Sequence, residues 1–253
     1  MMSRITNKNT LFISYDGLLD QLGSSQILPY VRHINHDVKK MHIISFEKRS
    51  KYNCEGETLH KILEKEKIHW HPLYFTNRFG SISKFYDLIK MQLMSFLISW
   101  KYKIAITHCR GHVSAISGLF LKFIFRVKYI FDFRGLWVDE RVDKGSWNLS
   151  KMSHKLQFSV FKHIERLSLI KSDHVVVLTN KACNEIEEKF NIIKSKISVI
   201  PCCADYSHFN VATPAQKLQS KSDLEIPNNS KVIGYLGSIG KMYMIAEMLK
   251  FLR

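Results

Sequence analysis

Short apolar runs alternate with amphipathic segments along most of the chain. Several of the runs are rich in β-branched residues and show no polar alternation, which is typical of strands buried on both faces of a sheet. These runs predict strands at residues 11–14, 41–46, 69–74, 104–108, 129–133, 174–178 and 196–200. Between them, apolar residues at helical spacing predict helices at 26–34, 57–66, 83–100, 114–125, 153–170 and 180–190. The alternation predicts an α/β fold, a parallel sheet with helices on both faces.

The helix predicted at 83–100 has a long apolar row, formed by Phe85, Leu88, Ile89, Leu93, Phe96, Leu97 and Trp100. Residues 81–130 contain eight Lys and Arg side chains, and Asp87 is their only acidic residue. We expect most of the apolar faces to belong to the core. A basic, aromatic-rich surface that binds anionic lipid is the alternative for this segment.

A polar segment at 210–231 predicts an interdomain linker. Val232–Gly240 then reads VIGYLGSIG, which predicts a buried strand and a glycine turn, and residues 242–252 predict the start of a helix. This order is how a nucleotide-binding α/β domain begins. We therefore predict an N-terminal domain at 1–209, a linker at 210–230 and an incomplete second domain at 231–253.

Composition narrows the protein class. The 253 residues are 45% hydrophobic, enough for a packed core, and the formal net charge is +16. Such a charge indicates an anionic partner, which could be nucleic acid, acidic lipid or a phosphorylated substrate. The alternative is a basic surface that only contacts solvent. The five cysteines form no C-x-x-C pair, which argues against a zinc site or a disulfide framework and predicts a reducing, cytoplasmic location. We see no signal peptide, and charged residues interrupt the apolar stretches, so we expect no transmembrane segment.

Ligands of parallel sheets bind at the carboxyl ends of the strands, where four segments converge. The first runs from Asp16 to Gln26 and contains a turn at Gly23, Ser24 and Ser25 before a helix. Its backbone N–H groups are candidates for binding phosphate or a substrate hydroxyl. The alternative is a loop that only turns the chain.

The second segment places His108 and Arg110 at a strand end, where both are candidates for the binding cleft. His108 and His112 have the spacing of metal ligands on a helix. We disfavour a metal site because no carboxylate or cysteine pattern accompanies them. A hydrogen-bonded structural histidine is the more ordinary role for at least one of the two.

The third segment, Phe131–Arg141, is a charged cluster beside aromatic residues. Asp132 and Arg134 share one face of the strand end, so the carboxylate is a candidate to orient a sugar hydroxyl or take its proton, and the arginine to bind phosphate. Asp139 and Glu140 offer a second acid/base candidate. The alternative is an Asp–Arg pair that only holds a loop. The fourth segment, 196–209, joins a strand, a proline and Asp205.

The chain resembles bacterial family-4 glycosyltransferases of the GT-B fold from about Leu11 to its end. The resemblance is carried by five motifs in the family's order, DGLLDQLGSSQILPY, FDFRGLWVDER, SDHVVVLTN, ISVIPCCADYSHF and VIGYLGSIG. It implies a Rossmann-like N-terminal domain, and transfer of a sugar from a nucleotide donor with retention of the anomeric configuration. It also implies that no metal or other cofactor is tightly bound, because helix N-termini and basic side chains hold the diphosphate.

The resemblance also implies roles for single residues in the N-terminal domain. Gly23, Ser24 and Ser25 match the loop near the donor phosphate and the acceptor. Asp132 and Arg134 fall where many relatives have a histidine-containing strand end. The last match is a P-x-x-x-D segment, in which Asp205 is the aspartate and Cys202 and Cys203 replace a common Asn-Gly pair.

In the second domain, Gly237 and Gly240 match a donor-binding glycine loop. Ser238 stands where relatives often have a phosphate-binding arginine, and Lys241 is a nearby source of that charge. The paired glutamates that hold the donor sugar and ribose in this family would lie beyond Arg253. We therefore expect little transferase activity from the chain alone, because transition-state binding needs both domains.

The leading prediction is a glycosyltransferase fragment. Its parent enzyme would transfer a sugar to a polyprenyl-diphosphate-linked glycan or a polysaccharide acceptor in cell-surface polysaccharide biosynthesis, as a peripheral protein at the inner face of the cell membrane. One alternative is an inactive remnant that serves as a basic membrane-surface or partner-binding domain. A nucleic-acid-binding protein is disfavoured because no recognition motif for DNA or RNA is present.

Overall fold

The computed structural model describes residues 7–76, 81–203, 206, 210–237, 239–240 and 243–251. The chain divides into two compact units, Met1–Cys202 and Cys203–Arg253.

The first unit is built on seven parallel strands, which confirms the predicted sheet. They are β1 (Asn9–Ser14), β2 (Lys40–Glu47), β3 (Ile68–Tyr74), β4 (Ile106–Arg110), β5 (Lys128–Asp132), β6 (His174–Val177) and β7 (Ile197–Val199). Their order across the sheet is β3-β2-β1-β4-β5-β6-β7. In the register, Ser14 pairs with Arg110, and Arg110 pairs with Asp132. The carboxyl ends of β1, β4 and β5 therefore lie level at one edge.

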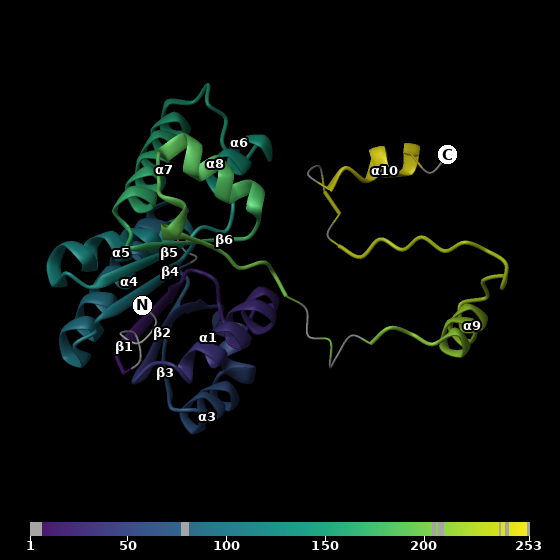
Figure 1. The fold of residues 1–253 in the computed structure, drawn as a ribbon, viewed down its shortest axis with the longest axis horizontal. Coiled ribbons are helices and arrows are strands. Elements are labelled where there is room, and N and C mark those ends of the chain that lie inside the picture. Colours follow the sequence, from purple (N-terminus) through teal and green to yellow (C-terminus); the bar gives the residue numbers. More distant parts are fainter. Residues whose placement is uncertain are drawn as a thin grey trace. The chain divides into compact units, whose positions relative to one another are not determined.

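Helices cover both faces of this sheet, as predicted (Figure 1). On one face, α1 (Leu28–Asn35) and α3 (Glu57–Lys65) pack over a core cluster that contains Phe12. On the other face, a larger cluster contains Leu11 and Ile13 and is covered by α4 (Ser81–Tyr102), α5 (Gly111–Phe125), α7 (Met152–Lys171) and α8 (Asn180–Phe190). Successive residues of β1 thus enter opposite layers, as the alternation of strand side chains requires.

Short elements that the apolar pattern did not predict connect the main ones. In the first unit they are the π-helical turn η2 (Gly23–Ile27), α2 (Arg49–Lys51), the π-helical turn η3 (Tyr52–Gly56), α6 (Trp137–Asp143) and the 3₁₀ turn η4 (Lys194–Lys196).

In the second unit, the predicted linker contains the helix α9 (Pro214–Asp223). Its start is a capping box: the Thr213 hydroxyl accepts from the Gln216 N–H at 3.3 Å, and the Gln216 side chain accepts from the Thr213 N–H at 2.8 Å. Pro214 fits at the first helical position because that residue donates no intrahelical hydrogen bond. The Thr-Pro-x-Gln signature was present in the sequence, so leaving this segment without a predicted helix was wrong.

The predicted buried strand after the linker is also wrong. Residues 232–236 are in no strand, and Val232, Ile233 and Leu236 are exposed. A single apolar segment becomes a strand only when another strand pairs with it. The described part of this unit supplies none. The helix α10 (Ile245–Phe251) falls within the helix predicted at 242–252.

The apolar row of α4 is an exception to the expectation that most apolar faces belong to the core. Five of the seven residues in that row are exposed: Phe85, Ile89, Leu93, Leu97 and Trp100. The side of α4 that packs on α5 and the sheet is instead rich in serine, because small side chains let helices approach closely. The Gln92 amide, for example, donates to the Ser117 hydroxyl of α5 at 2.9 Å. Among the described helices, none is long and apolar enough to cross a bilayer.

Candidate functional site

The edge formed by the carboxyl ends of β1, β4 and β5 brings together the main predicted site residues. Arg110 and Asp132 are the last residues of their strands, and Asp16 and Arg134 follow β1 and β5 by two residues. Gln26 enters from the π-helical turn before α1. This arrangement follows from the register of the sheet rather than from closeness in the sequence.

We call Gln26, His108, Arg110, Asp132 and Arg134 the arginine cluster. Its two arginines converge on one neutral oxygen. The Gln26 side-chain oxygen accepts from Arg110 Nη2 at 2.9 Å and from Arg134 Nη2 at 3.0 Å. Burial lowers the pKa of Arg110, and the neighbouring Arg134 guanidinium acts in the same direction. Two guanidinium groups held this close repel each other, so the pair favours an anion between or beside them.

The Asp132 carboxylate lies near the arginines without closing on them. Its oxygens are 3.6 Å from Arg134 Nη1, 3.7 Å from Arg110 Nη1 and 3.8 Å from His108 Nε2. Within the described part of the chain, His108 Nε2, Arg110 Nε and Asp132 Oδ1 are buried and have no hydrogen-bond partner. Buried polar atoms are normally paired, so three open ones at a single site indicate a place for a polar ligand.

Asp16 borders the cluster at its exposed side. Its carboxylate is 3.8 Å from Arg110 Nε. Desolvation raises the pKa of this carboxyl, while Arg110 acts against the shift.

The loop before α1 is tighter than the sequence suggested. Gly23, Ser24 and Ser25 lie in a helical turn, and both serine hydroxyls donate to the Gln21 carbonyl, at 3.2 and 2.6 Å. A Cβ at Gly23 would lie 1.9 Å from the Gly17 carbonyl oxygen, so this glycine is required for close packing. Pro29 has no N–H, so it cannot donate the usual helical hydrogen bond to the carbonyl four residues earlier. The π-helical turn before it accommodates the missing bond.

Three residues that the sequence reasoning missed support the site. Glu47, at the buried end of β2, accepts from the Leu18 N–H at 2.7 Å and so holds the loop after β1. Burial raises the pKa of Tyr30 to about 12, and Asp132 acts in the same direction. The Cys202 sulfur lies 3.3 Å from Arg134 Nη2. An acidic residue at the end of an apolar strand was a visible signal for Glu47. Tyr30 carried no such signal, and Cys202 stood out only as a departure from the family's Asn-Gly pair.

A second polar cluster, which we call the closed cluster, contains His112, Asp139, Lys162 and Glu165. His112 Nε2 lies 2.8 Å from Glu165, and Lys162 donates to Glu165 at 2.7 Å and to Asp139 at 2.9 Å. Burial acts to raise the pKa of Glu165, but the hydrogen bonds from His112 and Lys162 lower it overall. Asp139, a predicted site residue, therefore lies here with His112 rather than beside the arginines.

Glu140 lies apart from both clusters. It pairs with Lys144 at 3.1 Å on the exposed side of α6. No group of three or more His, Cys, Asp or Glu side chains among the described residues could hold a metal ion.

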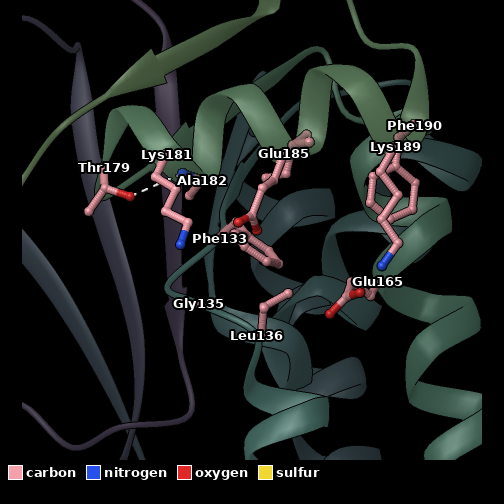
Figure 2. A pocket seen from close by; sticks show the side chains of 11 residues that line it. Phe133, Gly135, Leu136, Glu165, Thr179, Lys181, Ala182, Glu185, Lys189 and Phe190 are labelled. Atoms are coloured by element: carbon pink, nitrogen blue, oxygen red, sulfur yellow. Dashed lines mark hydrogen bonds between the residues drawn. The ribbon is translucent and has the colours of Figure 1, made fainter.

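A pocket of about 190 Å³ lies beside the arginine cluster, between α8 and the loop that follows Arg134. Phe133, Leu136 and Ile186 give it apolar walls. Figure 2 shows Lys181, Glu185 and Lys189 extending from α8 toward the loop of Gly135 and Leu136, so charged groups border an apolar interior.

The predicted donor-binding residues of the second unit are less defined. Gly237 and Gly240 are exposed. Ser238 and Lys241, together with Asp205, fall outside the residues that the structure describes.

Residues 42–208, more than half of the chain, match the family model described as Glycosyltransferase Family 4. The chain belongs to this family. The match spans β4, β5 and the residues of the arginine cluster that they carry, which confirms the resemblance seen in the motifs. No curated protein sequence is significantly similar to this one.

Solved structures agree on the fold of this family-4 chain. A glycosyltransferase from Rickettsia africae ESF-5 superposes with a TM-score of 0.54 at 20% identity, covering 98% of this chain and 58% of that one. Sucrose-phosphate synthase from Thermosynechococcus elongatus gives 0.54 at 13% identity, covering 88% and 53%. HepE (Alr3699) from Anabaena, in complex with UDP and glucose, gives 0.52 at 11% identity, covering 86% and 50%. The chain thus has the Rossmann-like architecture of GT-B glycosyltransferases and spans between 50% and 58% of the length of these proteins.

Proposed function

We propose that this chain is the acceptor-side part of a retaining glycosyltransferase that moves a sugar from a nucleotide-sugar donor to a lipid-linked glycan or polysaccharide acceptor. The observation that carries the proposal is the pair of arginines, Arg110 and Arg134, which share the Gln26 oxygen at the sheet edge. A phosphate oxygen that replaces or joins this amide oxygen would satisfy both guanidinium groups. Family membership supplies the reaction class.

The residues of the cluster take separate roles in this proposal. Arg110 and Arg134 bind a phosphate of the donor or of the acceptor. Asp132, with an unpaired buried oxygen, orients the acceptor hydroxyl or takes its proton, and His108 is the neighbouring group that stabilises the carboxylate. Asp16 contacts the acceptor from the exposed side of the site, and the pocket beside Gly135 takes an apolar part of it.

The donor is proposed to bind the second part of the protein as well. In this proposal, residues 1–209 form the acceptor-side domain, 210–230 the linker and 231–253 the first part of the donor domain. Gly237, Ser238, Gly240 and Lys241 would contact the diphosphate. The complex of HepE with UDP and glucose supports a nucleotide-sugar donor by analogy of fold.

The proposed setting is cell-surface polysaccharide assembly at the cytoplasmic face of the membrane. The net charge of +16 and a polyprenyl-diphosphate acceptor both suit an anionic surface.

Pyrophosphate binding, measured by titration calorimetry, tests the arginine site in the chain as it stands. We expect saturable binding that Arg110→Gln or Arg134→Gln weakens by about ten- to a hundredfold, the worth of a charge-assisted hydrogen bond. Arg141→Gln is the matched control, because Arg141 stacks on Trp137 outside the cluster. Equal binding by all three variants would disprove the phosphate role.

The reaction itself is tested by supplying radiolabelled nucleotide sugars and membrane lipid extracts to the chain expressed together with the coding sequence that follows it. We expect the label to appear in the lipid fraction. We also expect NMR to show that the product keeps the anomeric configuration of the donor. Binding of pyrophosphate without any transfer would favour the alternative, a binding domain that has lost catalysis.

A further inference from the structure

The helix α4 is amphipathic in the opposite sense to a surface helix of a globular protein. Among the side chains of this helix that the structure describes, the buried ones are Ser83, Asp87, Met91, Ser95, Ile98 and Ser99, of which four are polar. Its exposed side chains are Lys84, Phe85, Tyr86, Ile89, Leu93, Leu97, Trp100 and Lys101, of which six are apolar or aromatic. Surface helices normally point their apolar stripe at the core. Here the stripe points outward.

The exposed residues of α4 form one continuous ridge. Phe85, Ile89, Leu93 and Leu97 follow one another at intervals of four, and Trp100 extends the row by three. Neighbours at these intervals stack along one side of a helix. The helix has 22 residues, which corresponds to about 33 Å at 1.5 Å per residue. At its C-terminal end, the exposed Phe123 and Ile124 of α5 add apolar surface, and Phe96 and Phe125 link the two helices with ring centroids 5.2 Å apart.

The charged residues that the segment 81–130 places around this ridge are nearly all basic. Asp87, the only acidic residue in 81–130, is 2% exposed, and Thr76 and Lys90 hold its carboxylate with bonds of 2.7 Å each. Lys84, Lys101, Lys103 and Arg126 are exposed, and no ion pair of the described residues involves them. The ridge is therefore flanked at both ends by uncompensated cations.

We propose that the outer face of α4, with Phe123 and Ile124 of α5, is a docking surface that lies flat on an anionic lipid bilayer. The apolar ridge enters the acyl boundary, and the flanking lysines and Arg126 meet lipid phosphates. Trp100 and Tyr102 lie at the end of the helix, where indole and phenol rings favour the interface. The inference deepens the proposed function, on which its link to a lipid-borne acceptor rests, by assigning the membrane contact to one surface.

A bilayer fits this surface better than a second copy of the chain. A twofold interface would bring the same cations of two copies face to face, with no exposed acidic residue from 81–130 to offset them. A bilayer of anionic lipids supplies both a continuous apolar phase and the opposite charge.

Vesicle flotation of the whole chain tests the proposal. The probes are vesicles of phosphatidylcholine and vesicles in which part of it is replaced by phosphatidylglycerol. We expect flotation with the anionic vesicles and little with the neutral ones. Leu93→Gln/Leu97→Gln should lower partitioning at least about tenfold through lost apolar insertion. Lys101→Gln should lower it about fivefold, and only with anionic vesicles.

A matched pair of variants distinguishes the loss of this docking surface from a general effect of making the protein surface more polar. Ile89 on α4 and Ile62 on α3 are both 39% exposed, but α3 covers the opposite face of the sheet. Ile89→Gln should weaken flotation, and Ile62→Gln should leave it unchanged. The fluorescence of Trp100, the most exposed tryptophan, should shift to the blue with anionic vesicles, and Trp100→Phe should remove that shift. Circular dichroism confirms that each variant is folded.

Three results would overturn the proposal. They are absence of flotation with anionic vesicles, equal loss in Ile62→Gln and Ile89→Gln, and a self-association that the α4 variants abolish while flotation persists. Pyrophosphate titration of the same variants keeps the two proposals distinct. The α4 variants should retain pyrophosphate binding, and Arg110→Gln should retain flotation.

Discussion

The arginine cluster and the closed cluster use similar residues on two sides of a single glycine, yet they differ in how completely they are bonded. Arg110 ends β4 and His112 lies in the first turn of α5. Gly111, between them, has a φ of +78°, which lets the side chains on its two sides diverge. In the closed cluster, the three contacts are 2.7–2.9 Å long. In the arginine cluster, the ion pairs of Asp132 are 3.6–3.8 Å long, and three buried atoms have no hydrogen-bond partner among the residues that the structure describes.

This difference separates a structural network from a binding site. A fully satisfied buried network stabilises one arrangement of the elements that it joins, here α5, α6 and α7. An unsatisfied one costs stability unless a ligand completes it. Residue type alone would assign both clusters the same role. Their hydrogen bonds assign a structural role to the closed cluster and a binding role to the arginine cluster.

The largest expected effect comes from breaking the closed cluster. Glu165→Gln removes the charge that His112 and Lys162 face, so we expect a loss of about 3–5 kcal/mol in the free energy of unfolding. Urea denaturation measures it. Pyrophosphate binding by the folded fraction should persist. A loss below about 1 kcal/mol would show that the closed cluster is not a stabilising network.

Acid titration separates the closed cluster from a third buried group, the imidazoles of β2 and β3. Burial lowers the pKa of His42 to about 3 and of His71 to about 4, and the neighbouring His69 acts in the same direction. Folded pKa values below the ordinary histidine value of 6.5 mean that the unfolded chain takes up protons first as the pH falls. The neutral imidazoles therefore contribute fully to the free energy of unfolding above pH 6.5. This contribution is lost as the pH falls toward 4, and the loss is on the order of 2–3 kcal/mol. The pKa of Glu165 is lowered from 4.5, so the stability that its carboxylate contributes is lost only below pH 4.5.

His42→Phe should flatten the stability profile between pH 6.5 and 4. Denaturant midpoints at a series of pH values measure this, with His163→Gln on the exposed side of α7 as the control. Parallel profiles for His42→Phe and the original chain would contradict the assignment to these imidazoles.

The smallest expected effect on stability is at Asp132. Because the buried Asp132 carboxylate lies 3.6–3.8 Å from its charged neighbours, Asp132→Asn should change the free energy of unfolding by about 1–2 kcal/mol, less than the loss of the closely bonded Glu165. Loss of the carboxylate beside two guanidinium groups should raise pyrophosphate affinity about fivefold or more. Glu140→Gln is the control, since its exposed pair with Lys144 should matter for neither quantity. A large destabilisation by Asp132→Asn would make the arginine cluster a structural network as well.

The sequence predicted most of the fold and part of the candidate site. Apolar runs located all seven strands, and the rule that ligands meet strand ends led to Asp16, Gln26, His108, Arg110, Asp132 and Arg134. It could not separate Asp139 and Glu140 from them, because helix α6 turns these residues toward α7 and solvent. It also missed Cys202, which reaches Arg134 from a segment 68 residues away.

What the sequence by itself determined is the type of layer each segment joins, because strand and helix periodicity follow from local geometry. Only the tertiary structure decided which side of α4 is buried, since the serine-rich side fits closely on α5 and leaves the apolar side outward. It also decided that residues 232–236 form no strand, because pairing needs a second strand in space. The meeting of Arg110, Arg134 and Gln26 depends on the same cause, a sheet register that no local pattern encodes.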